Sequence, residues 1–220
     1  MHTMLNSTFR SCSGNVCFRR RRQSLVAGCA ALLMAAALHA QVHGTSMLKP
    51  PTGARIAIVE FDDLECPACA HANPLLEEAA AKYKIPWIRH DFLIPYHVWS
   101  KTAAVDARWF DTRSKALGDE YRNQVFANQN SIETAVELMQ FTQRFAQSHG
   151  IAMPFAVDPQ GKLLAEVDAD VELGKQLGIT QTPSIFIVTA GARGPSSMQV
   201  NDPDRDLYST IDRAVEETRH

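Results

Sequence analysis

Two cysteines separated by two residues form the segment whose spacing most directly indicates chemistry. Cys66-Pro67-Ala68-Cys69 follows an apolar stretch, Ile56–Phe61, that is typical of a buried strand, and precedes Ala70–Lys84, whose pattern is helical. At such a strand-to-helix corner, one thiol can attack a disulfide while the other resolves the mixed disulfide. The motif therefore predicts a redox-active pair. A static structural disulfide and half of a zinc site are the alternatives.

The remaining cysteines of the five lie in an N-terminal segment with the pattern of a targeting signal. They are Cys12, Cys17 and Cys29. Arg19–Arg22 supplies a positive region, and the apolar run Leu25–Leu38 is too short to favour a stable membrane span. A cut after Ala37 fits the small-residue rule better than a cut after Ala40, which would follow a bulky leucine. Cleavage would leave the Cys-x-x-Cys pair as the only cysteines, in a protein exported to an oxidising compartment.

Size and charge bound the rest of the chain. Removal of residues 1–40 leaves about 180 residues, enough for one domain with a substantial core. The net charge is −2, with 22 basic and 24 acidic residues, so nothing indicates nucleic-acid binding. Residues 41–54 are expected to form a flexible lead that is too short to serve as a dimerisation domain, which favours a monomer. We expect a periplasmic or secreted protein; an uncleaved membrane anchor is the less favoured alternative.

The elements around the motif follow a recognisable order. The pattern predicts strands at Arg55–Phe61, Pro86–Ile94 and Ser184–Val188, with Met198–Val200 as a partner strand, and helices at Pro67–Lys84, Asp168–Leu177 and Asp202–Thr218. Residues from about 97 to 150 are helical throughout, with Ser131 as a candidate cap and Gly150 as a terminator. The fold class is therefore α/β: a thioredoxin-like fold with an inserted helical block, within residues 55–220.

Three features of the chain resemble the DsbA-like branch of the thioredoxin superfamily. They are Val59-Glu60-Phe61 followed by the Cys-x-x-Cys motif, the long helical insertion, and Leu177-Gly178-Ile179-Thr180-Gln181-Thr182-Pro183 before a strand. The resemblance covers roughly residues 55 to 215. It implies thiol–disulfide exchange without a cofactor, exported cysteine-containing proteins as substrates, and a membrane quinone-linked oxidase as the redox partner.

The resemblance also assigns roles to single residues. Cys66, at the helix N-terminus, is the expected attacking thiol, because free backbone N–H groups and the helix dipole stabilise a thiolate there. Cys69 is then the buried resolving thiol. Pro183 matches the family's cis-proline and is expected to turn the Thr182 backbone toward substrate. Glu60 matches a buried acid that relays protons near the resolving cysteine; a glutamate that reaches solvent at a strand edge is the alternative.

One departure from the family pattern bears on the direction of the reaction. The strong oxidants of this family carry a histidine between the cysteines, where this chain has Ala68. The sequence favours a dithiol oxidase but leaves a reductase or isomerase open. A metal-binding module is the alternative from another class; it would need two more ligands, and His90 and His97 are too far apart for the usual zinc spacing.

Overall fold

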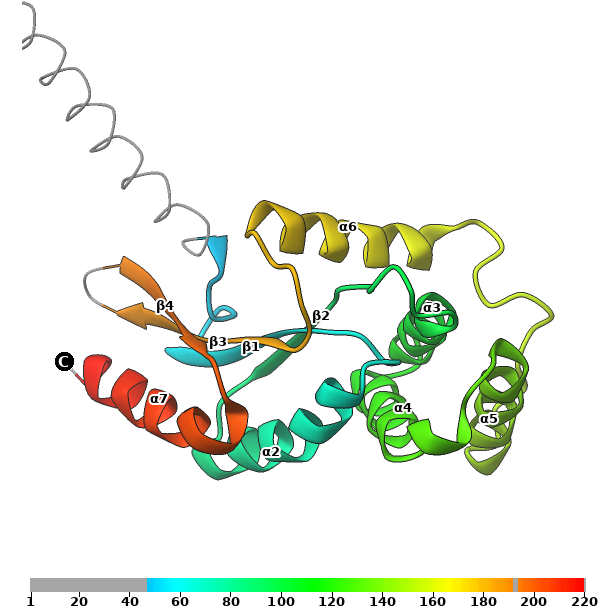
Figure 1. The fold of residues 1–220 in the computed structure, drawn as a ribbon, viewed down its shortest axis with the longest axis horizontal. Helices are drawn as coiled ribbons and strands as arrows, with labels where there is room; N and C mark the ends of the chain where they lie inside the picture. The colour runs from blue at the N-terminus through cyan, green and yellow to red at the C-terminus, as the bar shows by residue number, and fades with distance from the viewer. Residues whose placement is uncertain (1–46, 192–193, 220) are drawn as a thin grey trace, which may run out of the picture. The chain divides into compact units, whose positions relative to one another are not determined.

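The computed structural model describes residues 47–191 and 194–219 of the chain (Figure 1). The expected targeting segment, residues 1–40, and the lead up to residue 46 lie outside the described residues. At the end of the expected lead, Leu48 is only 4% exposed and packs with Ala57, Val59 and Phe186. The last part of that segment therefore belongs to the packed domain.

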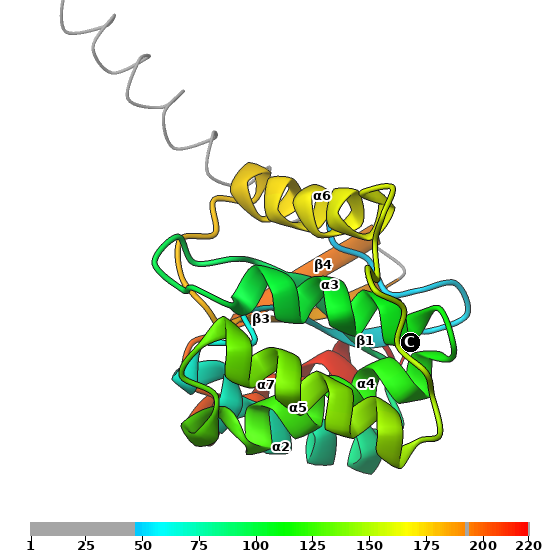
Figure 2. The same cartoon turned by 90° about the vertical axis from the view of Figure 1, so that its right-hand side faces the viewer.

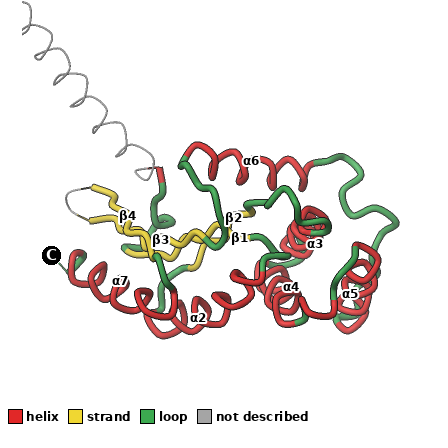
Figure 3. Tube along the Cα trace, in the orientation of Figure 1, coloured by secondary structure: helices red, strands yellow, loops and turns green. Residues whose placement is uncertain are grey.

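A four-stranded mixed sheet forms the centre of the domain (Figures 1 and 3). Its strands are β1 (Ile56–Asp62), β2 (Trp87–Asp91), β3 (Ser184–Gly191) and β4 (Gly194–Val200), in the order β2-β1-β3-β4. Strand β1 pairs parallel with β2 and antiparallel with β3, which pairs antiparallel with β4. All seven residues of β1 are buried, as expected for a central strand covered on both faces.

The helices fall into two groups. They are α2 (Pro67–Tyr83), α3 (Ser100–Asp111), α4 (Lys115–Ala127), α5 (Ala135–Ser148), α6 (Lys162–Gln176) and α7 (Pro203–Glu217). Helices α2 and α7 cover one face of the sheet and α6 lies on the other, whereas α3, α4 and α5 form a block beyond the end of the sheet (Figures 1 and 2). This arrangement confirms the predicted thioredoxin-like fold with its helical insertion. Within the described ranges, no helix has the length and apolar character needed to cross a membrane.

The buried apolar side chains divide between the sheet and the insertion. One cluster joins the sheet to α2 and α7, through residues such as Ile58, Leu76 and Ile211. A second cluster fills the insertion around aromatic rings that pack edge to face, and it also contains Cys66 and Cys69. The cysteine motif therefore lies where the thioredoxin-like core meets the helical insertion.

Three sequence-based boundaries were wrong. Helix α6 begins at Lys162 rather than Asp168, because the Asp158 carboxylate accepts a hydrogen bond from the Leu164 N–H at 2.9 Å and so caps the first turn from outside the helix. Helix α5 is capped by Thr134, not Ser131, through a capping box with Glu137. The final strand is longer than Met198–Val200: β4 runs from Gly194 to Val200 and pairs along the whole of β3.

Candidate active site

Cys66 occupies the N-cap of α2, as the strand-to-helix corner predicts. Its backbone is extended (φ −83°, ψ 119°), and Pro67 begins the helix, where a missing N–H costs no hydrogen bond. Cys66 is 8% exposed, and Cys69, one turn further along, is completely buried. Both cysteines are free thiols in this structure. An incoming sulfur can therefore reach Cys66, whereas Cys69 is accessible only from within the protein.

The surroundings of the pair make the two thiols chemically different. The pKa of Cys66 is lowered to about 5, chiefly by a hydrogen bond from the Cys69 thiol and further by Thr182 and the backbone N–H groups of Ala68 and Cys69; partial burial opposes the shift. The pKa of Cys69 is raised far above its ordinary value by burial, by its hydrogen bond to Cys66, and by the carboxyls of Asp62 and Glu60. Cys66 is therefore a thiolate at neutral pH and Cys69 a protonated thiol.

The loop between α6 and β3 faces the attacking thiol. As a thiol, the Cys66 Sγ donates to the Thr182 carbonyl oxygen at 3.5 Å, and the Thr182–Pro183 peptide bond is cis, as predicted. The Thr182 hydroxyl oxygen is buried and has no hydrogen-bond partner among the described residues while Cys66 is a thiol. It can therefore donate to the Cys66 sulfur once that sulfur is a thiolate, which agrees with its share in the lowered pKa of Cys66.

A cavity of about 300 Å³ lies beside this loop. Its lining combines Ala68 of the cysteine motif with Thr182, Pro183 and Ile185, together with residues at the start of α7. At its edge the exposed His71 imidazole pairs with the Asp204 carboxylate at 2.9 Å. The cavity therefore lies beside the first turn of α2, which carries the cysteine motif.

Glu60 is buried in the central strand, 1% exposed, and does not reach solvent. Its Oε2 accepts a hydrogen bond from the Trp87 indole Nε1 at 3.0 Å, and its Oε1 is a buried oxygen without a partner in the described structure. Burial, reinforced by the nearby Asp62 carboxyl, raises the pKa of Glu60 to about 8. This acid is therefore largely protonated at neutral pH, inside the protein and close enough to Cys69 to influence its ionisation.

The loop that carries Cys66 is fastened to the helical insertion, which sequence reasoning missed. Glu65 accepts hydrogen bonds from the N–H groups of Trp99 and Ser100 at 2.7 and 2.9 Å, at the start of α3. Gln129, which follows α4, donates through Nε2 to the carbonyls of Leu64 at 2.7 Å and Cys66 at 3.1 Å. No local pattern marks Gln129, because its partners lie more than sixty positions away. The insertion therefore holds the attacking cysteine in place.

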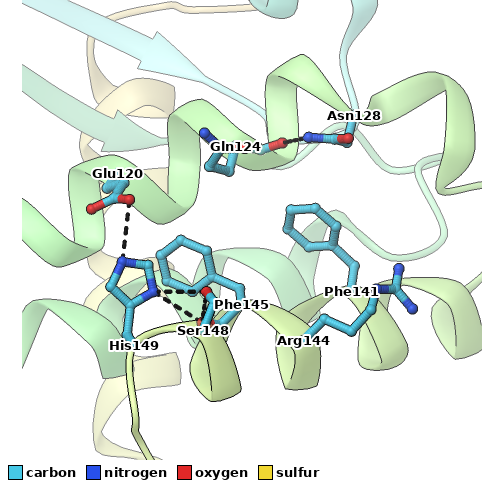
Figure 4. Close-up of a pocket in the computed structure, with 8 residues that line it drawn as sticks. All are labelled: Glu120, Gln124, Asn128, Phe141, Arg144, Phe145, Ser148 and His149. Atoms are coloured by element: carbon cyan, nitrogen blue, oxygen red, sulfur yellow. Dashed lines mark hydrogen bonds and ion pairs between the residues drawn. The ribbon is translucent and has the colours of Figure 1, made fainter.

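Another groove, of about 420 Å³, lies between α4 and α5 and contains neither cysteine (Figure 4). Its lining includes Arg144, Phe141 and an ion pair between the His149 imidazole and the Glu120 carboxylate at 3.2 Å. Among the described residues, no group of three or more His, Cys, Asp or Glu side chains is arranged to hold a metal ion.

Known proteins resemble this chain in both sequence and fold. A family described as "Thioredoxin" matches residues 44–199. A curated relative, the Na(+)/H(+) antiporter NhaA 3 of Salinispora tropica, is 23% identical over 155 residues, which are 69% of this chain but only 23% of the antiporter.

Solved structures with the same fold include several DsbA proteins. The α-DsbA1 of Wolbachia pipientis has a TM-score of 0.65 at 18% identity, covering 80% of this chain and 97% of its own. BdbD of Bacillus subtilis has a TM-score of 0.62 at 15% identity, covering 76% and 91%. DsbA2 of Pseudomonas aeruginosa has a TM-score of 0.59 at 16% identity, covering 78% and 95%. The chain belongs to the thioredoxin family, and its fold is that of the DsbA-like members.

Proposed function

We propose that the protein is an exported thiol–disulfide oxidoreductase that introduces disulfides into other exported proteins. The observation that carries the proposal is the unequal placement of the two thiols: Cys66 lies at the N-terminus of α2 against the Thr182 carbonyl, and Cys69 is completely buried. This placement shifts their pKa values in opposite directions. A stabilised Cys66 thiolate favours the reduced form of the pair and makes Cys66 a good leaving group. Both effects make the disulfide form a stronger oxidant, and so favour transfer of the disulfide to substrate.

The reaction proceeds in two exchange steps. A substrate thiolate attacks Cys66 Sγ of the disulfide form; a substrate–Cys66 bond forms, the Cys66–Cys69 bond breaks, and the electron pair stays on Cys69 Sγ. A second substrate thiolate then attacks the substrate sulfur of this mixed disulfide. The substrate disulfide forms, Cys66 leaves as its stabilised thiolate, and the protein is left reduced. The substrate has lost two electrons and the cysteine pair has gained them.

Glu60 supplies the proton that the first step requires. Cys69 leaves as a thiolate in a buried site where that charge is strongly disfavoured. The protonated Glu60 carboxyl gives its proton to this sulfur, and in the reverse direction the Glu60 carboxylate takes the proton back. A buried acid with a pKa near 8 can act in both directions close to neutral pH.

The cavity beside Thr182 and Pro183 is the proposed binding place for an extended substrate segment. The proposed substrates are cysteine-containing exported proteins, and a quinone-linked membrane oxidase restores the disulfide. The proposed location is the periplasm or the exterior, after removal of residues 1–40, and the proposed protein is monomeric. These assignments rest on the targeting pattern of the sequence and on the DsbA-like fold.

A dithiol peptide tests the proposed direction. The oxidised protein, mixed with one equivalent of a reduced peptide that contains two cysteines, is expected to convert the peptide to its disulfide. Cys66→Ser should abolish the transfer, and Cys69→Ser should trap the mixed disulfide when the reduced peptide is replaced by a disulfide peptide. If the reduced protein instead reduces or rearranges the disulfide peptide while the oxidised protein leaves the dithiol unchanged, the reductase or isomerase alternative replaces the oxidase.

A further inference from the structure

The two buried acids of β1, Glu60 and Asp62, accept hydrogen bonds from donors of different kinds. Glu60 and Asp62 are two positions apart on the same strand, so their side chains lie on the same face of the sheet. Asp62 accepts a hydrogen bond from Arg89 Nε at 3.2 Å and forms an ion pair with it. Among the described residues, Glu60 has only the neutral Trp87 indole as a hydrogen-bond donor. One acid is therefore neutralised by a cation and the other is not.

Each nitrogen of the Arg89 guanidinium donates to a partner other than Glu60. Besides Asp62, it donates through one terminal nitrogen to Asn123 at 3.0 Å and through the other to Asn73 at 2.9 Å. Its guanidinium carbon lies 4.3 Å from the centre of the Trp87 ring, in a cation–π contact that fixes the plane of the indole. Arg89 thus holds Trp87 in the orientation in which Nε1 reaches Glu60.

We propose that Trp87 is a positioning residue for proton transfer at Cys69, holding the Glu60 carboxyl with Oε1 free and setting the pH at which Glu60 gives up its proton. This inference rests on the proposed exchange reaction. A neutral donor stabilises the Glu60 carboxylate less than a cation would, so the acid still carries its proton when Cys69 is released. The other charged or titratable groups that interact with Glu60 are Asp62 of β1, Arg89 of β2, and Cys66 and Cys69 at the start of α2.

The wild-type chain provides a direct test without any substitution. In the reduced protein labelled with ¹⁵N and with ¹³C at glutamate carboxyls, the Trp87 indole N–H and the Glu60 carboxyl should titrate with the same midpoint. The Trp109 indole, also buried but located in α3, should show no transition at that pH. A Trp87 signal that does not change through the Glu60 transition would overturn the proposal.

Substitutions then test the direction of the effect. Trp87→Phe removes the hydrogen bond to the carboxylate and should move the Glu60 midpoint upward by roughly one pH unit. Glu60→Gln should remove the transition, and the matched control Trp109→Phe should leave the midpoint where it is. An unchanged Glu60 midpoint in a folded Trp87→Phe protein would contradict the inference.

A kinetic measurement links this titration to the reaction. The rate at which dithiothreitol reduces the oxidised protein, corrected for the fraction of dithiothreitol thiolate, should fall above the Glu60 midpoint because the acid has lost its proton. In Trp87→Phe that fall should move upward by the same amount as the carboxyl titration. If the wild-type disulfide does not exchange with dithiothreitol at all, the proposed function fails, whereas the coupled titration of Trp87 and Glu60 can still hold.

Discussion

Replacing Cys69 separates the contributions to the reactivity of Cys66. The largest cause of the lowered pKa of Cys66, about 5, is the hydrogen bond that its sulfur accepts from the Cys69 thiol. A hydrogen bond to a charged group contributes roughly 1.5–3 kcal/mol, and one pH unit corresponds to about 1.36 kcal/mol, so the loss of this bond should raise the pKa by roughly one to two units. Cys69→Ala should therefore bring the pKa of Cys66 to roughly 6–7.

The value should still stay below the pKa of about 8.5 of a free cysteine. The backbone N–H groups of Ala68 and of position 69 remain, as does the position of Cys66 at the start of α2. Cys69→Ser is the matched control: its hydroxyl can donate in place of the thiol, so the pKa of Cys66 should remain near the wild-type value.

The assay is the rate of alkylation of Cys66 by iodoacetamide, measured from about pH 4 to about pH 9, a range that brackets the lowered and the free thiol values. Peptide-level mass spectrometry distinguishes Cys66 from the N-terminal cysteines. The reasoning is refuted if Cys69→Ala and Cys69→Ser give the same pKa, since the side-chain donor then contributes nothing. It is equally refuted if both variants reach the pKa of a free cysteine, since the helix terminus and its N–H groups then have no effect.

Four further changes test other parts of the account. Thr182→Val removes a hydroxyl donor at nearly constant volume, so alkylation rates should show a raised pKa of Cys66, but a smaller rise than in Cys69→Ala. A rise as large as that of Cys69→Ala, or larger, would contradict the view that the Cys69 thiol is the stronger donor to Cys66. Glu60→Gln should raise the free energy of unfolding near pH 9 but not near pH 5, as measured by denaturant unfolding. The reason is that folding raises the pKa of Glu60 from its ordinary 4.5 to about 8, so the wild type loses stability as the pH rises from 4.5 to about 8. Equal effects at the two pH values would refute this. Gln129→Leu leaves the carbonyls of Leu64 and Cys66 without their side-chain donor and should lower the free energy of unfolding by about 1–3 kcal/mol. An unchanged free energy of unfolding would show that the hydrogen bonds from Gln129 do not stabilise the loop that carries Cys66. Ala68→His should raise the reduction potential, by about 30 mV for each 1.4 kcal/mol gained by the thiolate, and an unchanged potential would mean that the existing donors already suffice.

The local parts of the site could be predicted from the sequence. A Cys-x-x-Cys motif between an apolar strand and a helix places one thiol at the helix N-terminus by chain connectivity alone, and the structure has Cys66 there. The Thr-Pro pair before a buried strand likewise indicated the loop that faces Cys66. Both signals lie within a few residues of the element that positions them.

The long-range parts of the site could not be predicted. No local pattern marks Trp87 as a partner of Glu60, because nothing in its neighbourhood shows that the diagonal position on the adjacent strand is an acid. The role of Arg89 depends on four partners from separate elements. Such contacts arise from the register of β1 against β2 and from the packing of α2 and α4, neither of which a single sequence specifies.

The boundary errors have two different physical origins. The cap of α5 was visible, since Thr134 and Glu137 have the spacing of a capping box and Ser131 lacks an acid at the third position that follows it. The start of α6 was not, because Gly161 offers no side-chain cap and the carboxylate that replaces it comes from Asp158 in the preceding loop. One error therefore came from missing a local signal, the other from a cap outside the helix.

The reduction potential of the Cys66–Cys69 couple, measured by equilibration with glutathione, tests the central claim most directly. A stabilised Cys66 thiolate beside a buried Cys69 thiol should make the couple clearly more oxidising than thioredoxin, with a potential of about −200 mV or higher against about −270 mV for thioredoxin. A potential at or below about −270 mV would contradict the assignment as a dithiol oxidase and would identify the pair as a reductant.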